Sequence, residues 1–175
     1  MLFLSKVIGK FECLRFNVGL LNNRLKIQTT DVFSFLKIIL LLEPLASLKK
    51  RNLTGTIRLT RNSKIFKTIL EAIQEKKGEN IVSIDLRKIS EAVSDFFIIC
   101  EASNQPQIRT IAENVEDKVR ALIGEKPYHT EGYKNLQWVL IDYVNIVVHV
   151  MYPESRRFYK LEEMWSDASI VNHKS

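Results

Sequence analysis

The chain has 175 residues, of which 46% are hydrophobic and 26% are charged, a balance typical of a soluble globular protein and not of a disordered one. This length allows one domain with a sizeable core and an appendage. The net charge of +6 lies wholly in the first third, since residues 1–60 carry ten Lys or Arg and three Asp or Glu, against sixteen and seventeen in residues 61–175. The second part therefore has no surplus positive charge with which to neutralise a nucleic-acid backbone.

Residues 1–61 are rich in basic and apolar side chains, but no pattern in them assigns a fold. Their most apolar stretch, 32–42, contains Lys37 and is far shorter than the roughly 20 residues of a membrane-spanning helix. Two interpretations stay open: an organellar transit peptide, or translation from an upstream start with the true start near residue 60. The first predicts an organellar location. The second predicts a cytoplasmic location.

From residue 62 the apolar residues recur regularly, which predicts one domain over 62–168 and a loose tail over 169–175. Helical periods alternate with short strand-like runs, and Gly or Pro residues stand near the ends of the helices. The predicted elements are a helix at 65–73, strands at 81–86 and 95–100, a helix at 106–122, strands at 127–131, 138–143 and 146–152, and a helix from 153 to 165. This order predicts an α/β fold with a mixed sheet of about five strands flanked by helices.

No catalytic or metal-binding motif stands out in the sequence. The six glycines are too widely spread for a phosphate-binding loop, and the chain has no HExxH, CxxC, GxSxG, Asp-x-Asp or Asp-x-Glu. The two cysteines, Cys13 and Cys100, lack metal-ligand spacing, and Cys100 ends an apolar run typical of a buried strand. We therefore expect neither a cofactor nor a metal, and no enzymatic activity.

His149 and Asp142 form the one pair that suggests catalysis. They lie on two neighbouring predicted strands, and an Asp–His pair can form half of a catalytic relay. No serine or cysteine nucleophile is apparent beside them. A structural hydrogen bond that fixes the imidazole tautomer is the simpler interpretation, and a contact in a protein interface is the third. From the residues alone, the sequence indicates an α/β binding domain without a visible active site.

Three further side chains are candidates for binding. Trp138 opens a predicted strand after a polar stretch, where a large aromatic residue is either an exposed contact or part of the core. Arg156 and Tyr159 are three residues apart on the last predicted helix and so share a face, which a solvated, ion-pairing surface would also explain. Trp165 continues the apolar side of that helix and is expected in the core.

Five blocks of sequence, taken in order, resemble the ribosomal silencing factor family, also called Iojap-like. The blocks are SDFFIICEASNQPQIRTIAENVED at 94–117, EG at 131–132, WVLIDY at 138–143, NIVVHVM at 145–151 and ESRRFYKLEEMW at 154–165. Each is short, but their order is specific, and the resemblance runs from about Ile81 to Ala168. It implies a nucleotidyltransferase-like fold without the catalytic carboxylates, in agreement with the missing Asp-x-Asp.

The resemblance also implies a function and a set of residues. Family members bind the large ribosomal subunit through its ribosomal protein fourteen and sterically block joining of the small subunit, which represses translation without any chemistry. The residues that match the family motifs and are expected to contact the partner are Trp138, His149, Met151, Arg156 and Tyr159. Those expected to be structural or to border the interface are Asp95, Glu131, Asp142, Glu162 and Trp165.

Two other functions stay open: a large-subunit assembly factor that contacts ribosomal RNA through residues 1–60, and a nucleotidyltransferase-like enzyme that uses Asp142 and His149. Exposed sheet edges also allow a homodimer, whereas neither a membrane nor DNA is expected as a partner. The sequence departs from the family pattern at Val144-Asn145, where Gly-Asp is usual. Because valine resists positive φ, a turn wider than a two-residue type I′ turn is expected there.

Overall fold

A computed structural model describes residues 59–89 and 92–174, so the expectations for residues 1–58 lie outside the described residues. The elements in chain order are α4 (Lys64–Glu75), β1 (Glu79–Asp85), β2 (Phe96–Glu101), α5 (Gln105–Ile123), β3 (His129–Glu131), β4 (Trp138–Asp142), β5 (Ile146–Met151), α6 (Pro153–Tyr159), α7 (Leu161–Met164) and β6 (Ser169–Asn172). The predicted α/β class is confirmed.

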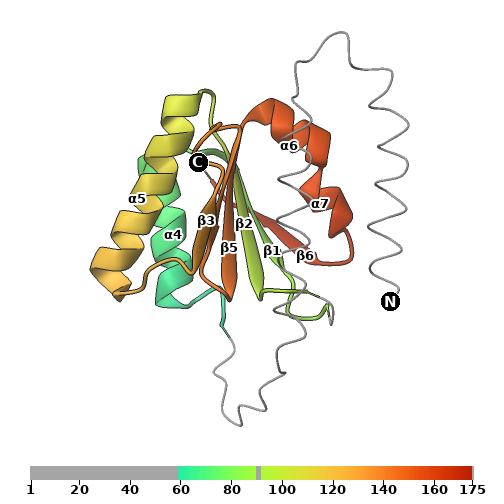
Figure 1. The fold of residues 1–175 in the computed structure, drawn as a ribbon. Coiled ribbons are helices and arrows are strands. Elements are labelled where there is room, and N and C mark those ends of the chain that lie inside the picture. Colours follow the sequence, from blue (N-terminus) through green and yellow to red (C-terminus); the bar gives the residue numbers. More distant parts are fainter. Residues whose placement is uncertain (1–58, 90–91, 175) are drawn as a thin grey trace. The chain divides into compact units, whose positions relative to one another are not determined.

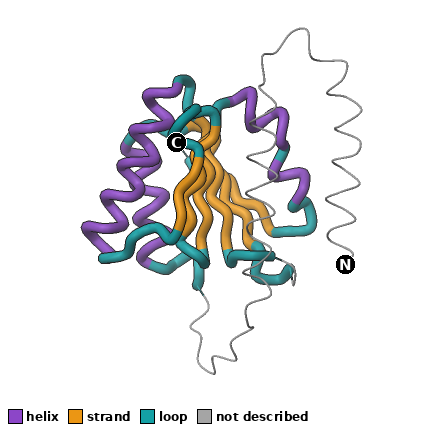
Figure 2. The backbone as a smooth tube through the Cα atoms, in the orientation of Figure 1, coloured by secondary structure: helices purple, strands orange, loops and turns teal. Residues whose placement is uncertain are grey.

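The strands form one mixed sheet in the order β3-β4-β5-β2-β1-β6 (Figures 1 and 2). The central pair, β2 and β5, is parallel, and every other neighbouring pair is antiparallel. The mixed sheet agrees with the prediction, but it has six strands where about five were expected. A parallel pair needs a long crossover, and α5 lies in the segment that joins β2 to β5.

The additional strand is the segment predicted to be a loose tail. Residues 169–172 pair antiparallel with β1, from Asp85 opposite Ser169 to Val82 opposite Asn172. Beyond the strand, His173 Nε2 lies 2.8 Å from Ser83 Oγ. The prediction of a loose tail is therefore wrong for residues 169–173. Its sequence carries a weak strand signal because Ser and Asn flank only two β-branched residues, and pairing with β1 supplies the order.

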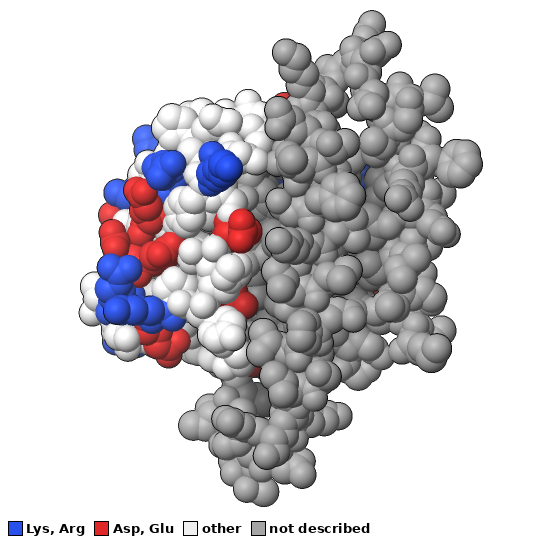
Figure 3. Space-filling view, viewed as in Figure 1, with Lys and Arg blue, Asp and Glu red and all other residues white. Residues whose placement is uncertain are grey.

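Helices α4 and α5 pack on one face of the sheet, and their sequences explain their ends (Figure 1). Asn104 caps α5, because its side-chain oxygen accepts a hydrogen bond of 2.8 Å from the Gln107 backbone N–H. Gly124 ends the helix with a φ of 82°, a left-handed conformation that glycine adopts without strain. On the outer surface of these helices, Lys and Arg are interspersed with Asp and Glu (Figure 3).

The main core lies between these two helices and the sheet. Alternation along the strands directs one set of side chains toward α4 and α5, so the apolar runs of β2 and β5 are buried on both sides. The core members from the strands include Phe96, Ile98, Cys100, Val139, Ile141, Ile146, Val148 and Val150. The alternate residues of β2, β4 and β5 therefore face the opposite side, where α6 and α7 lie (Figure 1).

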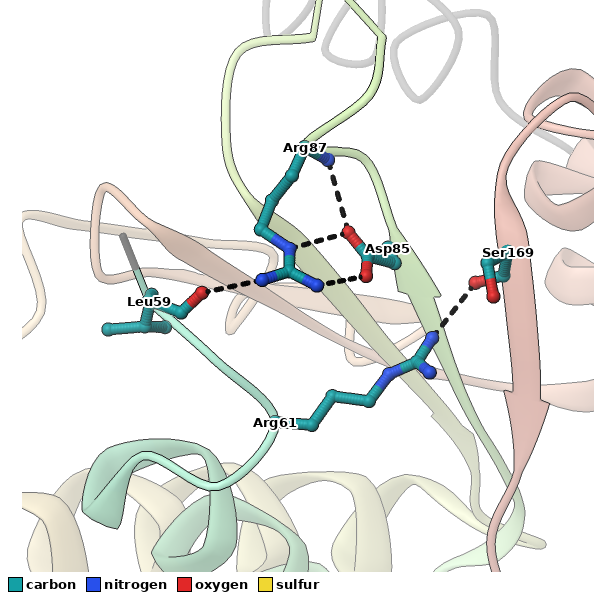
Figure 4. A network of polar contacts seen from close by, with 5 residues as sticks. All are labelled: Leu59, Arg61, Asp85, Arg87 and Ser169. Atoms are coloured by element: carbon teal, nitrogen blue, oxygen red, sulfur yellow. Dashed lines mark hydrogen bonds and ion pairs between the residues drawn. The ribbon is translucent and has the colours of Figure 1, made fainter. Parts of the chain in front are cut away.

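A polar network fastens the start of the domain to its edge (Figure 4). Arg87 donates two hydrogen bonds to the Asp85 carboxylate, at 2.8 and 2.6 Å, and a third to the Leu59 carbonyl at 3.1 Å. Arg61 donates to the Ser169 carbonyl of β6 at 3.1 Å. Residues 59–61 therefore make specific contacts with the domain, although its predicted boundary was residue 62. Pairing with Arg87 holds the pKa of the Asp85 carboxyl below its usual range.

The turn between β4 and β5 is short and strained. The Tyr143 N–H donates to the Ile146 carbonyl at 2.9 Å, so Val144 and Asn145 alone span the turn. Val144 has a φ of 70°, and the Asn145 N–H donates back to the Tyr143 carbonyl at 2.8 Å. The expectation of a wider turn was wrong. The surrounding hydrogen bonds hold Val144 in a conformation that a β-branched residue rarely adopts.

Candidate functional site

The sheet face opposite α4 and α5 carries the candidate site. On β5, the side chains of residues 147, 149 and 151 belong to this face, because residues 146, 148 and 150 are in the core. His149 lies opposite Leu140 of β4, and Met151 lies opposite Trp138. A single residue separates the end of β5 from Pro153, which starts α6, and the last two helices lie over this side of the sheet (Figure 1).

Six rings form a continuous series across this face, which we name the aromatic row. Its members, each touching the next, are Trp165, Phe97, His149, Trp138, Tyr159 and Phe158. Successive ring centroids are 5.8, 4.9, 5.6, 5.1 and 5.0 Å apart. Edge-to-face and tilted contacts at these separations are favourable for aromatic pairs. The row begins in the interior at the buried Trp165 and reaches the surface at the half-buried Trp138, Tyr159 and Phe158.

A hydrogen bond joins the indole of Trp138 to the imidazole of His149. The indole N–H donates to Nδ1 over 3.1 Å, and since the indole nitrogen can only donate, Nδ1 is the acceptor. The ring proton of neutral His149 must therefore sit on Nε2, which has no hydrogen-bond partner among the described residues. Burial lowers the pKa of His149 to about 3 and keeps the ring neutral, in line with its exposure of 4%.

Asp142 and His149 do not form the pair that the sequence suggested. Asp142 lies opposite Val147, two residues before His149. Its carboxylate accepts a hydrogen bond from the Val144 backbone N–H at 2.6 Å, and its neighbour on the other side is His129 of β3. Asp142 thus stabilises the turn, and burial raises its pKa. Cys100 is fully buried, and burial raises the pKa of its thiol to about 12, so a thiolate nucleophile does not form there near neutral pH.

The glycine of the EG motif allows a close approach to Trp138. Gly132 has a φ of 95°, and a Cβ at this position would lie 1.8 Å from the Trp138 carbonyl oxygen. The Leu136 N–H closes the intervening loop onto the Gly132 carbonyl at 3.0 Å. Only glycine fits there, and the loop fixes the backbone of Trp138. The preceding Glu131 is exposed on β3, with a carboxylate oxygen 3.5 Å from His129.

Arg156 joins α6 to the sheet and to α7. Its Nη1 donates to the Asn80 carbonyl at 2.7 Å and lies 3.2 Å from a Glu101 carboxylate oxygen, while its Nε donates to Glu162 at 2.7 Å. The guanidinium is therefore surrounded by acceptors in a buried setting. This arrangement sets the position of Tyr159, one turn further along α6, against Trp138.

The structure divides the ten residues selected from the sequence into two groups. Of the five expected to contact a partner, Trp138 and Tyr159 are half-buried, whereas His149, Met151 and Arg156 have exposures of 4%, 0% and 9%. These three were expected at the surface and lie inside the fold. Of the other five, Glu162 pairs with Arg156, Trp165 packs on Phe97, and the Asp95 N–H donates to the Asn145 carbonyl. Glu131 lies on the edge strand β3, and Asp142 lies at the end of β4 beside the turn.

Phe97 and Phe158, which were not among the site residues expected from the sequence, complete the aromatic row. Phe97 belongs to an unbroken apolar run, and only strict alternation along β2 distinguishes it from the core residues Phe96 and Ile98. Phe158 precedes Tyr159 and contacts it edge-to-face.

Two negative observations apply to the residues described. Within 59–89 and 92–174, no three His, Cys, Asp or Glu side chains gather in a way that could hold a metal ion. In the same part of the chain, no helix has the length and apolar character needed to cross a membrane.

These features define the class of protein: an α/β domain with a six-stranded mixed sheet, two long helices on one face and an aromatic row on the other. Residues 60–175 match the family model described as "Ribosomal silencing factor during starvation". This match spans well over half of the chain. The chain therefore belongs to the ribosomal silencing factor family, as the sequence blocks predicted.

Curated relatives and solved structures agree with this assignment. The "Ribosomal silencing factor RsfS" of Halalkalibacterium halodurans is 36% identical over 110 residues, which are 63% of this chain and 92% of the relative. The chloroplastic protein Iojap of Zea mays is 31% identical over 107 residues, covering 59% of this chain and 44% of the relative. A crystal structure of a Bacillus halodurans protein superposes with a TM-score of 0.55 at 32% identity, over 63% of this chain and 98% of that one.

Proposed function

We propose that this protein binds the large ribosomal subunit through ribosomal protein fourteen and sterically blocks joining of the small subunit. The observation that carries the proposal is the membership of residues 60–175 in a family described as silencing ribosomes during starvation. Occlusion needs no catalytic group, because a protein that occupies one docking face shifts the joining equilibrium by its own affinity. We place its action where the ribosomes of this organism translate: in the bacterial cytoplasm, or in an organelle if residues 1–60 are a transit peptide.

The exposed end of the aromatic row supplies a suitable contact surface. Trp138 and Tyr159 are half-buried and hold each other with ring centroids 5.1 Å apart. Rigid aromatic side chains of this kind dominate the binding energy of protein interfaces, which bury roughly 800 Å² on each partner. Because His149, Met151 and Arg156 lie beneath or beside these rings, we assign to them the support of the surface and not direct contact.

The charge of the domain favours a protein partner over RNA. Residues 61–175 carry sixteen Lys or Arg and seventeen Asp or Glu, and those on α4 and α5 are interspersed with each other (Figure 3). Binding that depends on phosphate neutralisation would need a surplus of positive charge. An assembly factor that holds ribosomal RNA remains the second candidate only through residues 1–58, which lie outside the described part of the chain.

The test is co-sedimentation of the full chain with purified large subunits, followed by addition of small subunits. We expect the wild-type protein to travel with the large subunit and to reduce the yield of joined ribosomes. Tyr159→Ala and Trp138→Ala should weaken both effects at least tenfold, because each removes a central aromatic contact. Leu122→Ala is the matched control, since Leu122 is 51% exposed on α5, away from the aromatic row.

Two results would contradict the proposal. A wild-type protein that does not sediment with the large subunit would remove the proposed function altogether. Binding that falls steeply with salt and is insensitive to both aromatic substitutions would favour the RNA-binding alternative. Light scattering of the free protein measures separately whether it forms the homodimer that exposed sheet edges allow.

A further inference from the structure

His149 occupies an unusual place for a polar side chain. It lies in the middle of the aromatic row, between the interior ring of Phe97 and the half-buried ring of Trp138, with centroids 4.9 and 5.6 Å away. One ring nitrogen accepts the indole N–H, and the other has no hydrogen-bond partner among the described residues. A phenylalanine would fill the same space without the unpaired ring nitrogen, but it would offer no acceptor to the indole N–H, so the acceptor is what a histidine adds here.

We propose that His149 is a positioning residue for partner binding: its Nδ1 accepts the indole N–H of Trp138 and fixes the orientation of the ring that the partner contacts. This inference rests on the proposed function, because it concerns the same surface. It assigns to His149 an effect on affinity that is exerted through Trp138, and no direct contact with the partner.

The geometry shows how this hydrogen bond orients the indole. Backbone contacts from Gly132 fix the start of the Trp138 side chain, and Tyr159 packs against the ring. Rotation of the indole about its own side-chain bonds, including the flip that exchanges its two edges, would move the N–H away from Nδ1. The bond to His149 selects the orientation with the N–H edge directed inward.

Fixing the ring in advance should strengthen binding. A side chain that is mobile in the free protein loses its freedom when a partner binds, and this loss weakens the affinity. With the indole already held in place by His149, that loss does not occur at the moment of binding. For one side chain, the entropy lost on immobilisation corresponds to an affinity roughly three- to tenfold weaker.

The groups around the imidazole are consistent with its role as an acceptor. Among the described residues, the carboxylates of this region have other partners: Asp142 is directed to the Val144 N–H, and Glu101 and Glu162 pair with Arg156. With Nδ1 accepting, the ring is neutral and keeps its proton on Nε2. An imidazolium would carry a proton on both nitrogens and could not accept the indole N–H.

The experiment is a double-mutant cycle on the full chain, read as the dissociation constant for the purified large subunit. His149→Phe keeps an aromatic ring and removes the acceptor, whereas Trp138→Phe keeps a ring and removes the donor. We expect His149→Phe to weaken binding about three- to tenfold in the wild-type background. In the Trp138→Phe background the same substitution should change the affinity less than twofold, because no indole N–H remains to be positioned.

A conservative variant separates positioning from stability. In His149→Asn the carboxamide oxygen takes approximately the place of Nδ1, so it should accept the indole N–H and restore most of the affinity. The same variant loses the ring contacts and should be less stable to urea than His149→Phe. Opposite orders of affinity and stability in these two variants are expected from positioning, and a purely structural role predicts the same order for both.

The indole N–H can also be observed without any partner. In ¹⁵N-labelled protein, the Trp138 N–H resonance should shift in His149→Phe and exchange faster with solvent, with the Trp165 N–H as internal reference. Equal weakening by His149→Phe in both backgrounds, or no weakening at all, would overturn the positioning role while leaving the proposed function in place. A wild-type protein that does not bind the large subunit would overturn both.

Discussion

Arg156 and Glu101 lie 3.2 Å apart between α6 and β2, and both side chains are largely withdrawn from solvent. Glu101 also accepts a hydrogen bond from the Asn80 side chain, while Arg156 reaches the Asn80 carbonyl. The charged pair therefore joins α6, the helix that carries Tyr159, to the C-terminal end of β2. Arg156, which the sequence placed on an exposed helix face with Tyr159, thus supports the aromatic row.

Arg156→Ala should destabilise the protein by about 3 kcal/mol, because it leaves the carboxylates of Glu101 and Glu162 without their shared cation. The measurement is urea unfolding followed by circular dichroism. Arg157→Ala is the matched control, since Arg157 is exposed and pairs with Glu154 on its own helix, and a change below about 0.5 kcal/mol is expected. Similar small losses for both variants would show that the buried pair does not hold α6.

Gly132→Ala should be strongly destabilising, by about 3 kcal/mol, because the new methyl group would collide with the Trp138 carbonyl in addition to the positive φ. Gly124→Ala provides a comparison, since its φ is also positive but a Cβ there would meet nothing within 4 Å. Its cost should be only about 1 kcal/mol. Urea unfolding followed by tryptophan fluorescence measures the free energy of unfolding of both variants. Equal losses of stability would mean that the close approach of Gly132 to Trp138 is unimportant.

Val144→Gly should stabilise the protein by about 1 kcal/mol. The φ of 70° strains a β-branched residue, whereas glycine adopts it freely, and the gain exceeds the additional entropy of glycine in the unfolded chain. Val144 is 57% exposed, so little packing is lost. Val93→Gly, at another exposed valine but without a positive φ, should be neutral or destabilising. A lower melting temperature for Val144→Gly than for the wild-type protein would show that the positive φ of Val144 does not destabilise the fold.

Acid should destabilise the fold through His149. Its pKa is about 3 in the folded protein, against an ordinary value of 6.5, so between these values the unfolded chain binds the proton and the folded one does not. Its contribution to stability is complete above pH 6.5 and declines as the pH falls toward 3. Between pH 7.5 and pH 5 the free energy of unfolding should fall by about 2 kcal/mol from this group.

The comparison for this pH effect is His149→Phe, which removes the titrating ring. Burial also lowers the pKa of His173, so both proteins retain that smaller dependence in the same direction. The difference between the two urea-unfolding series isolates His149. Parallel pH profiles for wild type and variant would show that His149 is not held neutral in the folded state.

The sequence was sufficient to predict the fold class and the main helix. Asn104, Pro106 and Gly124 set the ends of α5 by local chemistry, and such signals act within a few residues. The apolar run that ends at Cys100 indicated a buried strand, but it did not identify β5 as the parallel neighbour of β2. Trp138 was singled out by its place at a strand start, and the structure leaves it half-buried.

What the sequence could not predict depends on residues far apart in the chain. Arg156 looks solvent-exposed until Asn80 is known to lie beside it, 76 residues earlier. His149 was paired with Asp142 by proximity in a predicted hairpin, but the actual register places Leu140 opposite it, with Trp138 and Asp142 on the two diagonals. Only the side-chain bonds decide between them, because the Asp142 carboxylate accepts from the Val144 N–H and the Trp138 indole donates to His149. β6 could not be predicted from its own residues, because its strand conformation depends on pairing with β1.

Apart from β6, which adds to the outer side of β1, the sheet is assembled from two local units, the antiparallel pair β1–β2 and the meander β3–β4–β5, which join where β2 runs parallel to β5. Each unit can form from neighbouring segments, but this junction requires the whole stretch between the two strands to close as one loop, with α5 inside it. The rate-limiting event in folding should therefore be the docking of these two halves. A defect in the buried side chains of that junction would slow folding more than a defect of equal energetic size in either hairpin turn.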